Sequence, residues 1–214
     1  MNILVVAAHP DDEVLGMGAT IKKLAEKGHK IHLCVISEGV SAQYKNDLKM
    51  KKIRKESCIK AGKILGISSI DFFEFPDGQL DTIPQLEINN KLEKIISKFQ
   101  PKIVYTTSNH DMSIDHQKVF NSTIVASRPQ SSSVKQVLCY EILGSIKSPF
   151  EPNCFEDVTK HFEAKIKAFK QYNSEIEKFP HPRSFEAIEN LAIYRGMESG
   201  LKKAEAFRLV RSIN

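Results

Sequence analysis

The stretch that decides the fold is Ile3-Leu4-Val5-Val6-Ala7-Ala8-His9-Pro10-Asp11-Asp12-Glu13. Its apolar run, rich in Val and Ile, predicts a strand that is buried on both faces of a parallel sheet. A polar turn follows at once, and the residues after it have the apolar spacing of an amphipathic helix. In open α/β sheets, ligands bind in the crevice beyond the carboxyl ends of the strands. The sequence therefore places ionisable side chains where such a sheet binds its ligands.

The acidic residues of this turn also have a purely structural interpretation. Pro10 suits the first position of a helix, and Asp11, Asp12 and Glu13 suit its first turn because the helix dipole favours negative charge there. That interpretation leaves His9 unexplained. The spacing of three residues between His9 and Asp12 lets both side chains converge on one point, while Asp11 projects in another direction.

Strands and helices alternate along the rest of the chain. Strands are predicted at residues 2–7, 30–36, 71–75, 102–107 and 136–143, with a final edge strand at 204–210. Helices are predicted at 13–27, 46–65, 86–99, from the loop at 108–116 to about 126, at 155–172 and at 184–203. This order predicts an α/β protein with a doubly wound, mainly parallel sheet and helices on both faces. We predict one domain over 1–214, with a core at about 1–145 and a C-terminal helical elaboration at about 146–214.

The composition is that of an ordinary globular protein. The chain has 214 residues, of which 41% are hydrophobic, enough for a sizeable core. Its apolar runs are too short for a membrane span, and its N-terminus lacks the pattern of a signal peptide. The scattered cysteines, Cys34, Cys58, Cys139 and Cys154, have neither metal-ligand nor redox spacing. They indicate buried free thiols in a reducing cytoplasm.

The charge pattern gives little support for a nucleic-acid partner. The net charge is +5, and basic residues alternate with acids along the predicted helices. The densest basic run, at residues 49–55, has apolar residues at helical spacing and is interpreted as the solvated face of a helix. No aromatic residues interleave with it to stack bases. We expect no nucleic acid and no membrane span, and the sequence leaves the oligomeric state open, a homo-oligomer included.

A second polar cluster follows the predicted strand at 102–107, and it ends in Asp115-His116. A catalytic metal needs protein ligands and one open position, and two imidazoles with one carboxylate are a common zinc set. His9, Asp12 and His116 supply that set if the strand order brings the two loops side by side. Taken alone, His116 would be a histidine at a helix start with no further role. Two such clusters at one face of a sheet favour a metal site.

These motifs resemble the PIG-L / LmbE-like family of zinc-dependent N-acetyl-sugar deacetylases. The most specific match is the hexapeptide at 8–13, together with Asp115-His116. Further matches lie at residues 54–56, 75–78, 140–141, 181–184, 195–196 and 204–207, so the resemblance spans nearly the whole chain. It implies a Rossmann-like sheet with one zinc ion at the carboxyl ends of its strands. It also implies hydrolysis of the acetamido group of an N-acetylglucosamine-type sugar or conjugate, with release of acetate and a free amine.

Carried over residue by residue, the resemblance assigns His9, Asp12 and His116 as metal ligands. Asp11 matches the general base, and Arg54 matches an arginine that contacts substrate. In physical terms, zinc polarises the amide carbonyl and acidifies water, Asp11 takes the proton of the attacking water, and Asp11 can return it to the leaving amine.

One position departs from the family pattern. Many relatives have a histidine three residues before the last zinc ligand, and here that position is Ser113. We predict that His110 takes its place, oriented by Asp111 or Asp115. His110 and Arg183 are then the candidate donors to the tetrahedral oxyanion, and Arg183 is expected near the substrate opening.

Other readings stay open on the sequence alone. A mononuclear iron(II) enzyme would use the same two histidines and one carboxylate. Magnesium-dependent phosphoryl transfer through Asp11 and Asp12 is weaker, because histidine suits zinc better and no Gly-rich phosphate loop is present. A non-catalytic sugar-binding protein would keep the pocket, although the retained Asp11 argues against it. His181 fits a rigid turn as well as it fits a substrate site.

Overall fold

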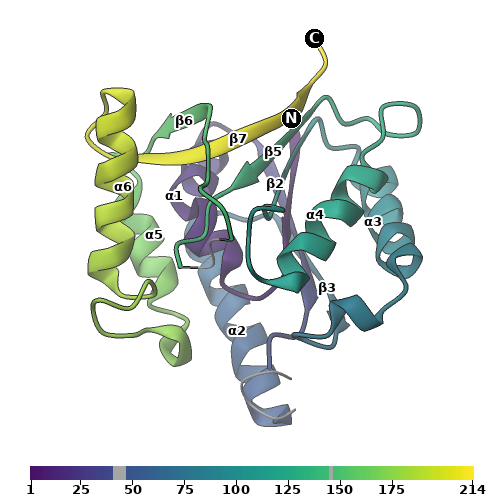
Figure 1. Cartoon of the computed structure of the whole chain (residues 1–214), viewed down its shortest axis with the longest axis horizontal. Coiled ribbons are helices and arrows are strands. Elements are labelled where there is room, and N and C mark those ends of the chain that lie inside the picture. Colours follow the sequence, from purple (N-terminus) through teal and green to yellow (C-terminus); the bar gives the residue numbers. More distant parts are fainter. Residues whose placement is uncertain (41–46, 145–146) are drawn as a thin grey trace.

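One sheet runs through the molecule. The computed structural model describes residues 1–40, 47–144 and 147–214, and within them seven strands have the order β3-β2-β1-β4-β5-β7-β6 (Figure 1). Their bounds are β1 Asn2–Ala7, β2 Lys30–Ser37, β3 Ser69–Phe75, β4 Ile103–Thr106, β5 Gln136–Tyr140, β6 Cys154–Asp157 and β7 Ala204–Ser212. The first five strands are parallel, and β7 pairs antiparallel with β5 and with β6. The predicted doubly wound, mainly parallel sheet is confirmed.

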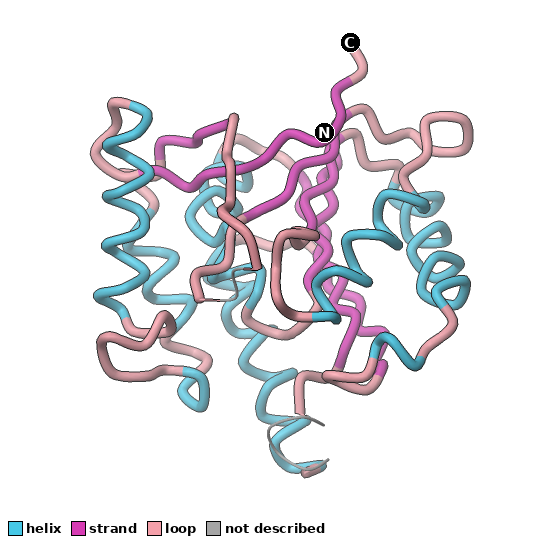
Figure 2. Tube along the Cα trace, viewed as in Figure 1, coloured by secondary structure: helices cyan, strands magenta, loops and turns pink. Residues whose placement is uncertain are grey.

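Helices cover both faces of the sheet (Figures 1 and 2). One face carries α1 (Asp12–Glu26), α2 (Leu48–Leu65), α5 (Phe162–Phe169) and α6 (Phe185–Ser199). The other face carries α3 (Gln85–Phe99) and α4 (Ile114–Ala126). Side-chain oxygens of Asp47, Ser113 and Ser184 accept hydrogen bonds from backbone N–H groups in the first turns of α2, α4 and α6, which fixes where these helices begin. Residue 46, the predicted start of α2, lies outside the described residues.

The opening apolar run fills two cores at once. Successive side chains of a strand point to opposite faces. Ile3, Val5 and Ala7 therefore pack among the helices of the first face, whereas Leu4 and Val6 pack against α3 and α4. Each of these side chains has no exposed surface. A continuous apolar run, without alternation, is what such a doubly covered strand requires.

The strand order explains why two distant polar clusters meet. β1 and β4 are parallel neighbours, with Ile3 opposite Ile103. The chain leaves β1 into α1 on one face and leaves β4 toward α4 on the other. This is the switch point at which open α/β sheets form their ligand crevice. The turn that carries His9 and the loop that leads to His116 both border it.

Two predictions for the C-terminal region are wrong. The helix predicted at 155–172 is replaced by β6 and by the shorter α5, because Phe155 lies opposite Ala206 in an antiparallel ladder. Local apolar spacing fits a helix there, but pairing with a strand much later in the chain decides the outcome. The predicted edge strand β7 lies inside the sheet, and β6 forms the edge. The division into a core and a C-terminal elaboration stays a prediction.

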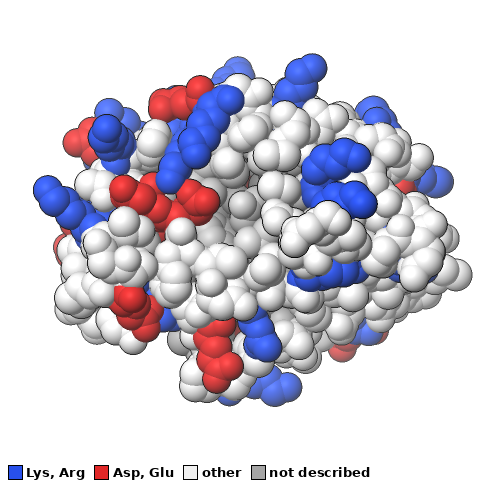
Figure 3. Space-filling model, turned by 90° about the horizontal axis from the view of Figure 1, so that it is seen from above, with Lys and Arg blue, Asp and Glu red and all other residues white. Residues whose placement is uncertain are grey.

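The surface agrees with the predicted charge pattern. Acidic and basic side chains are interspersed over the face seen in Figure 3. The basic run at 49–55 lies on α2 and is mostly exposed or half-buried, but Arg54 is only 3% exposed and points inward. All four cysteines are free; three are buried as predicted, and Cys154 is partly exposed. Within the described ranges, no helix combines the length and apolarity needed to cross a bilayer.

Close packing of α1 on β5 depends on Gly16. A Cβ atom there would lie 2.3 Å from Cδ2 of Tyr140, whose hydroxyl donates to the Val6 carbonyl at 2.9 Å. We expect Gly16→Ala to lower the free energy of unfolding by about 1–3 kcal/mol through this clash, although alanine favours helix. Urea denaturation measures the change. In the double variant with Tyr140→Leu the loss should be smaller than the sum of the single losses, and simple additivity would rule out the clash.

Candidate metal centre and active site

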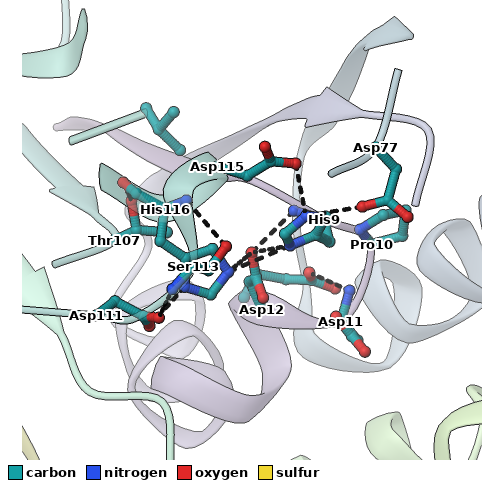
Figure 4. A network of polar contacts seen from close by, with 12 residues as sticks. His9, Pro10, Asp11, Asp12, Asp77, Thr107, Asp111, Ser113, Asp115 and His116 are labelled. Carbon is teal, nitrogen blue, oxygen red and sulfur yellow. Dashed lines mark hydrogen bonds and ion pairs between the residues drawn. The ribbon is translucent and has the colours of Figure 1, made fainter. Parts of the chain in front are cut away.

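Three ligand-type atoms converge at the switch point (Figure 4). His9 Nδ1 lies 3.2 Å from His116 Nε2, and Asp12 Oδ2 lies 3.5 Å from the first and 3.4 Å from the second. In a tetrahedral zinc site with bonds of about 2.0–2.1 Å, neighbouring ligand atoms lie about 3.3 Å apart. The donor types and their separations therefore fit one metal ion. The structure brings the predicted ligand set together, and its role in binding metal stays a prediction.

Carboxylates hold the opposite nitrogen of each imidazole. His116 Nδ1 lies 2.6 Å from Asp111 Oδ2. His9 Nε2 lies 3.0 Å from Asp77 Oδ1 and 3.1 Å from Asp115 Oδ2. Partners of this kind fix the ring orientation and keep the proton on the outer nitrogen, so that the inner nitrogen is free to bind a metal.

A second group of ligand-type atoms shares one of these histidines. It consists of His9 with Asp77 and Asp115. Both oxygens of Asp115 already accept backbone N–H groups, from Gly78 at 2.7 Å and from Leu80 at 3.1 Å. This group also has only one imidazole, which suits zinc less well. The set with two histidines is the better candidate.

The electrostatics of the centre favour a positive charge between the two rings. Burial lowers the pKa of His116, but Asp12 and Asp111 more than offset it and raise the pKa to about 9. Burial likewise lowers the pKa of His9, and Asp115 and Asp12 raise it well above its usual value. Burial raises the pKa of Asp12, yet the two histidines hold it well below the ordinary range. Protons and a metal cation would compete for this position.

Asp11 lies beside this set and is not part of it. Its backbone φ is 130°, a region that residues other than glycine rarely adopt, so the turn stores strain here. The turn is held because the Asp11 carbonyl accepts N–H groups of Val14 and Leu15, and its own N–H donates to Glu13 Oε2 at 3.1 Å. Burial of the Glu13 carboxylate raises its pKa to about 7.

The Asp11 carboxylate is fully buried, yet its oxygens accept no hydrogen bond from the described residues. Arg54 Nη2 and Arg183 Nη2 each lie 3.4 Å from Oδ2. Burial raises the pKa of Asp11, while Arg183 and Arg54 lower it, and the net shift is upward. The buried carboxylate therefore keeps unused hydrogen-bonding capacity beside the candidate ligand set.

A third carboxylate, that of Glu175, explains why Arg54 and Arg183 make no closer contact with Asp11. Glu175 has a fully buried side chain and lies 2.8 Å from Arg54 Nη1 and 2.6 Å from Arg183 Nη1. Both guanidiniums are therefore closer to Glu175 than to Asp11. Sequence reasoning missed Glu175, which lies in a short 3-10 helix, Asn173–Glu175, after α5. Its only local signal was a carboxylate eight residues before Arg183.

Two open lobes meet at the candidate centre. The first lobe has a volume of about 360 Å³ and is lined by Gly39, Arg54, Asp77, Gly78, Ile114 and Asp115. The second lobe has a volume of about 380 Å³ and extends along Ile142, Leu143, Glu177, His181 and Pro182. His9, Ser113 and Arg183 line both lobes. Ser113, which occupies the position where the family pattern predicts a histidine, therefore lies where the lobes join.

His110 lies apart from this arrangement. Its Nδ1 lies 2.7 Å from Ser148 Oγ, and its Nε2 accepts a hydrogen bond from Arg208 Nη1. It lines a separate cavity and neither lobe. The predicted orientation of His110 by Asp111 or Asp115 is wrong, because those carboxylates hold the candidate ligands instead. The sequence could not show that β7 brings an arginine to this histidine.

The switch point of this doubly wound sheet carries two histidines and one carboxylate that could hold a metal ion, with the separate Asp11 carboxylate beside them. The family profile "PIG-L: GlcNAc-PI de-N-acetylase" matches residues 4–127. The chain is also 34% identical over 182 residues to the uncharacterized deacetylase YaiS of Escherichia coli K12. The aligned segment covers 81% of this chain and 91% of that protein. The chain belongs to the PIG-L family and is a deacetylase, an amide hydrolase.

Solved structures share the fold across different chemistries. The N,N'-diacetylchitobiose deacetylase of Pyrococcus horikoshii aligns with a TM-score of 0.82 at 23% identity, over 98% of this chain and 84% of that chain. GalB, the 4-carboxy-2-hydroxymuconate hydratase of Pseudomonas putida KT2440, aligns with the same TM-score and identity, over 100% and 97%. At 23% identity these likenesses establish the fold alone, because one fold can carry different reactions.

Asp111 should control metal affinity. We expect Asp111→Asn to weaken zinc binding by roughly 10- to 100-fold, because the amide no longer fixes the His116 ring through a charged hydrogen bond. Competition with a chromophoric chelator measures the affinity. Asp81→Asn, at an exposed position outside the centre, is the matched control. Equal zinc affinity in Asp111→Asn and the unaltered protein would contradict the orienting role.

Glu175 should keep the two arginines from closing on the Asp11 carboxylate. In Glu175→Gln the amide cannot accept both guanidiniums, so Arg183 is expected to turn toward Asp11 and block it. We expect kcat to fall roughly 10- to 100-fold while metal content stays constant, and a crystal structure should show a shortened contact between Arg183 and Asp11. Glu186→Gln, which is exposed, is the control. An unchanged kcat in Glu175→Gln would exclude this role.

Proposed function

We propose that this protein hydrolyses the N-acetyl group of an N-acetylglucosamine-type sugar or sugar conjugate with one zinc ion per chain, releasing acetate and a free amine. One observation carries the proposal: beside a metal-type ligand set lies the buried Asp11 carboxylate, whose oxygens have no hydrogen-bond partner among the described residues. Family membership and the activities of similar proteins support the N-acetyl sugar as the substrate class. The free cysteines support action in a reducing compartment such as the cytoplasm.

His9, Asp12 and His116 would hold the ion, which when bound supplies polarisation of the amide carbonyl and acidification of water. Asp11 accepts a proton from the water molecule that attacks the carbonyl carbon. The carbon–nitrogen bond then breaks, and Asp11 donates that proton to the departing nitrogen. The sugar leaves as an amine, the acyl group leaves as acetate, and Asp11 returns to its starting state.

Arg183 is the better candidate for the oxyanion donor. Its side chain is 30% exposed and lines both lobes, whereas His110 lines neither. A preorganised cation near the developing oxyanion stabilises the transition state. Arg54 is almost fully buried and lines the first lobe, where it would contact the substrate. Its bond to the Pro10 carbonyl, 2.7 Å long, holds it against the active-site turn.

The rival readings have less support. An iron(II) enzyme would use the same ligands, but membership of a deacetylase family favours hydrolysis over oxygen chemistry. A non-catalytic sugar-binding protein has no use for a buried carboxylate whose oxygens are left without hydrogen bonds.

Asp11→Asn separates metal binding from turnover. The asparagine has the same shape but cannot take a proton, so we expect zinc content to be unchanged and turnover to fall by roughly 10²- to 10⁴-fold. Zinc is measured by elemental analysis, and turnover by acetate release from N-acetylglucosamine and N,N'-diacetylchitobiose. Zinc-replete Asp11→Asn with a rate near that of the unaltered protein would refute the assignment of the base.

A further inference from the structure

The side chain of Glu13 is buried behind the active-site turn and has no part in the proposed chemistry. It has no exposed surface, and burial of a carboxylate costs folding free energy unless its oxygens find partners. Its Oε2 accepts the backbone N–H of Asp11 at 3.1 Å, and its Oε1 accepts the hydroxyl of Tyr172 at 2.5 Å. Glu13 therefore connects the backbone of the proposed base to a residue that lies 159 positions further along the chain.

The backbone of Asp11 needs such a contact because its conformation is unfavourable. Its φ of 130° lies in a region that residues other than glycine rarely adopt. Strain of this kind persists only where surrounding contacts hold it. The hydrogen bond from the Asp11 N–H requires that the Glu13 carboxylate keep its orientation. Because rotation about φ also turns the Cα–Cβ bond relative to the preceding residues, this orientation affects where the Asp11 carboxylate lies.

Tyr172 is well placed to fix the orientation of the Glu13 carboxylate. It follows α5, and its side chain is fully buried in the core on the α1 side of the sheet. Its N–H donates to the Phe169 carbonyl at 2.9 Å, and its carbonyl accepts the N–H of Glu175 at 2.8 Å. Both the ring and the backbone of Tyr172 are therefore held, and its hydroxyl is a preorganised donor to Glu13.

The segment that begins at Tyr172 reaches Asp11 by two routes. Three residues further on, Glu175 takes the close contacts of both active-site arginines and so affects the surroundings of the Asp11 carboxylate. Tyr172 acts through Glu13 on the Asp11 backbone. Neither Tyr172 nor Glu13 is among the described residues that line the two lobes. A change at either position should therefore act through Asp11 and not through contact with substrate.

We propose that Tyr172 is a positioning residue for the base: through Glu13 it holds the backbone of Asp11 in the conformation that keeps its carboxylate beside the candidate ligand set. The inference rests on the proposed deacetylase function, in which Asp11 accepts and returns the proton.

Tyr172→Phe tests this role, because it removes the hydroxyl and keeps the ring in the core. We expect kcat for acetate release by the zinc-loaded protein from N-acetylglucosamine or N,N'-diacetylchitobiose to fall roughly three- to thirtyfold, because a small misplacement of a catalytic group is costly. KM and zinc content should stay close to those of the unaltered protein. A crystal structure of Tyr172→Phe should show a changed φ at Asp11.

Two further variants distinguish positioning from packing. Glu13→Gln should lose less activity than Tyr172→Phe, because its amide can accept the Asp11 N–H and donate to the Tyr172 oxygen. Tyr105→Phe is the control and should keep its kcat, because it removes a hydroxyl from another buried ring, one that packs against Phe207 away from the centre.

A double variant gives the sharpest test. With Asp11→Asn there is no base to position, so adding Tyr172→Phe should lower kcat no further. An equal loss in that background, an unchanged kcat in Tyr172→Phe alone, or a loss in Glu13→Gln as large as in Tyr172→Phe would overturn the positioning role and leave the deacetylase function intact. Failure of the unaltered protein to release acetate from either substrate would overturn the function and the positioning role together.

Discussion

The candidate centre depends on the parallel pairing of β1 with β4. Only this pairing brings His9 and His116, which are 107 residues apart in sequence, to within 3.2 Å of one another. The pairing is secured by a strand whose side chains fill two cores with no exposed surface. Stability and function are therefore linked: the apolar run that anchors the sheet also fixes the position of the polar turn behind it.

Around this centre, other carboxylates pair with the histidines and arginines, and among the described residues the Asp11 carboxylate has no hydrogen-bond partner. Asp111, Asp77 and Asp115 hold the outer nitrogens of the two imidazoles. Glu175 takes the close contacts of both arginines. Asp11 lies in a strained turn, and within the described residues neither of its carboxylate oxygens has a hydrogen-bond partner. A buried carboxylate without hydrogen bonds costs folding free energy, and strain of this kind persists where the surrounding structure over-determines it and function uses it.

The sequence predicts those features that rest on local pattern and on general rules of topology. The apolar run, the three-residue spacing of His9 and Asp12, and the switch-point rule were sufficient to predict the convergence with His116. Features that depend on contacts between segments far apart in the chain could not be predicted from the sequence. β6 forms a strand because β7 pairs with it, Arg208 holds His110 away from both lobes, and Glu175 acquires its role only when α2 and the loop before α6 meet. No local periodicity carries that information.

The account depends on a single metal ion between His9, Asp12 and His116. Anomalous diffraction at the zinc edge, from crystals of the protein grown with zinc, tests it most directly. The account predicts one peak at bonding distance, about 2.0–2.1 Å, from His9 Nδ1, His116 Nε2 and an Asp12 oxygen. A peak confined to the group of His9, Asp77 and Asp115, or no peak at either position, would contradict it.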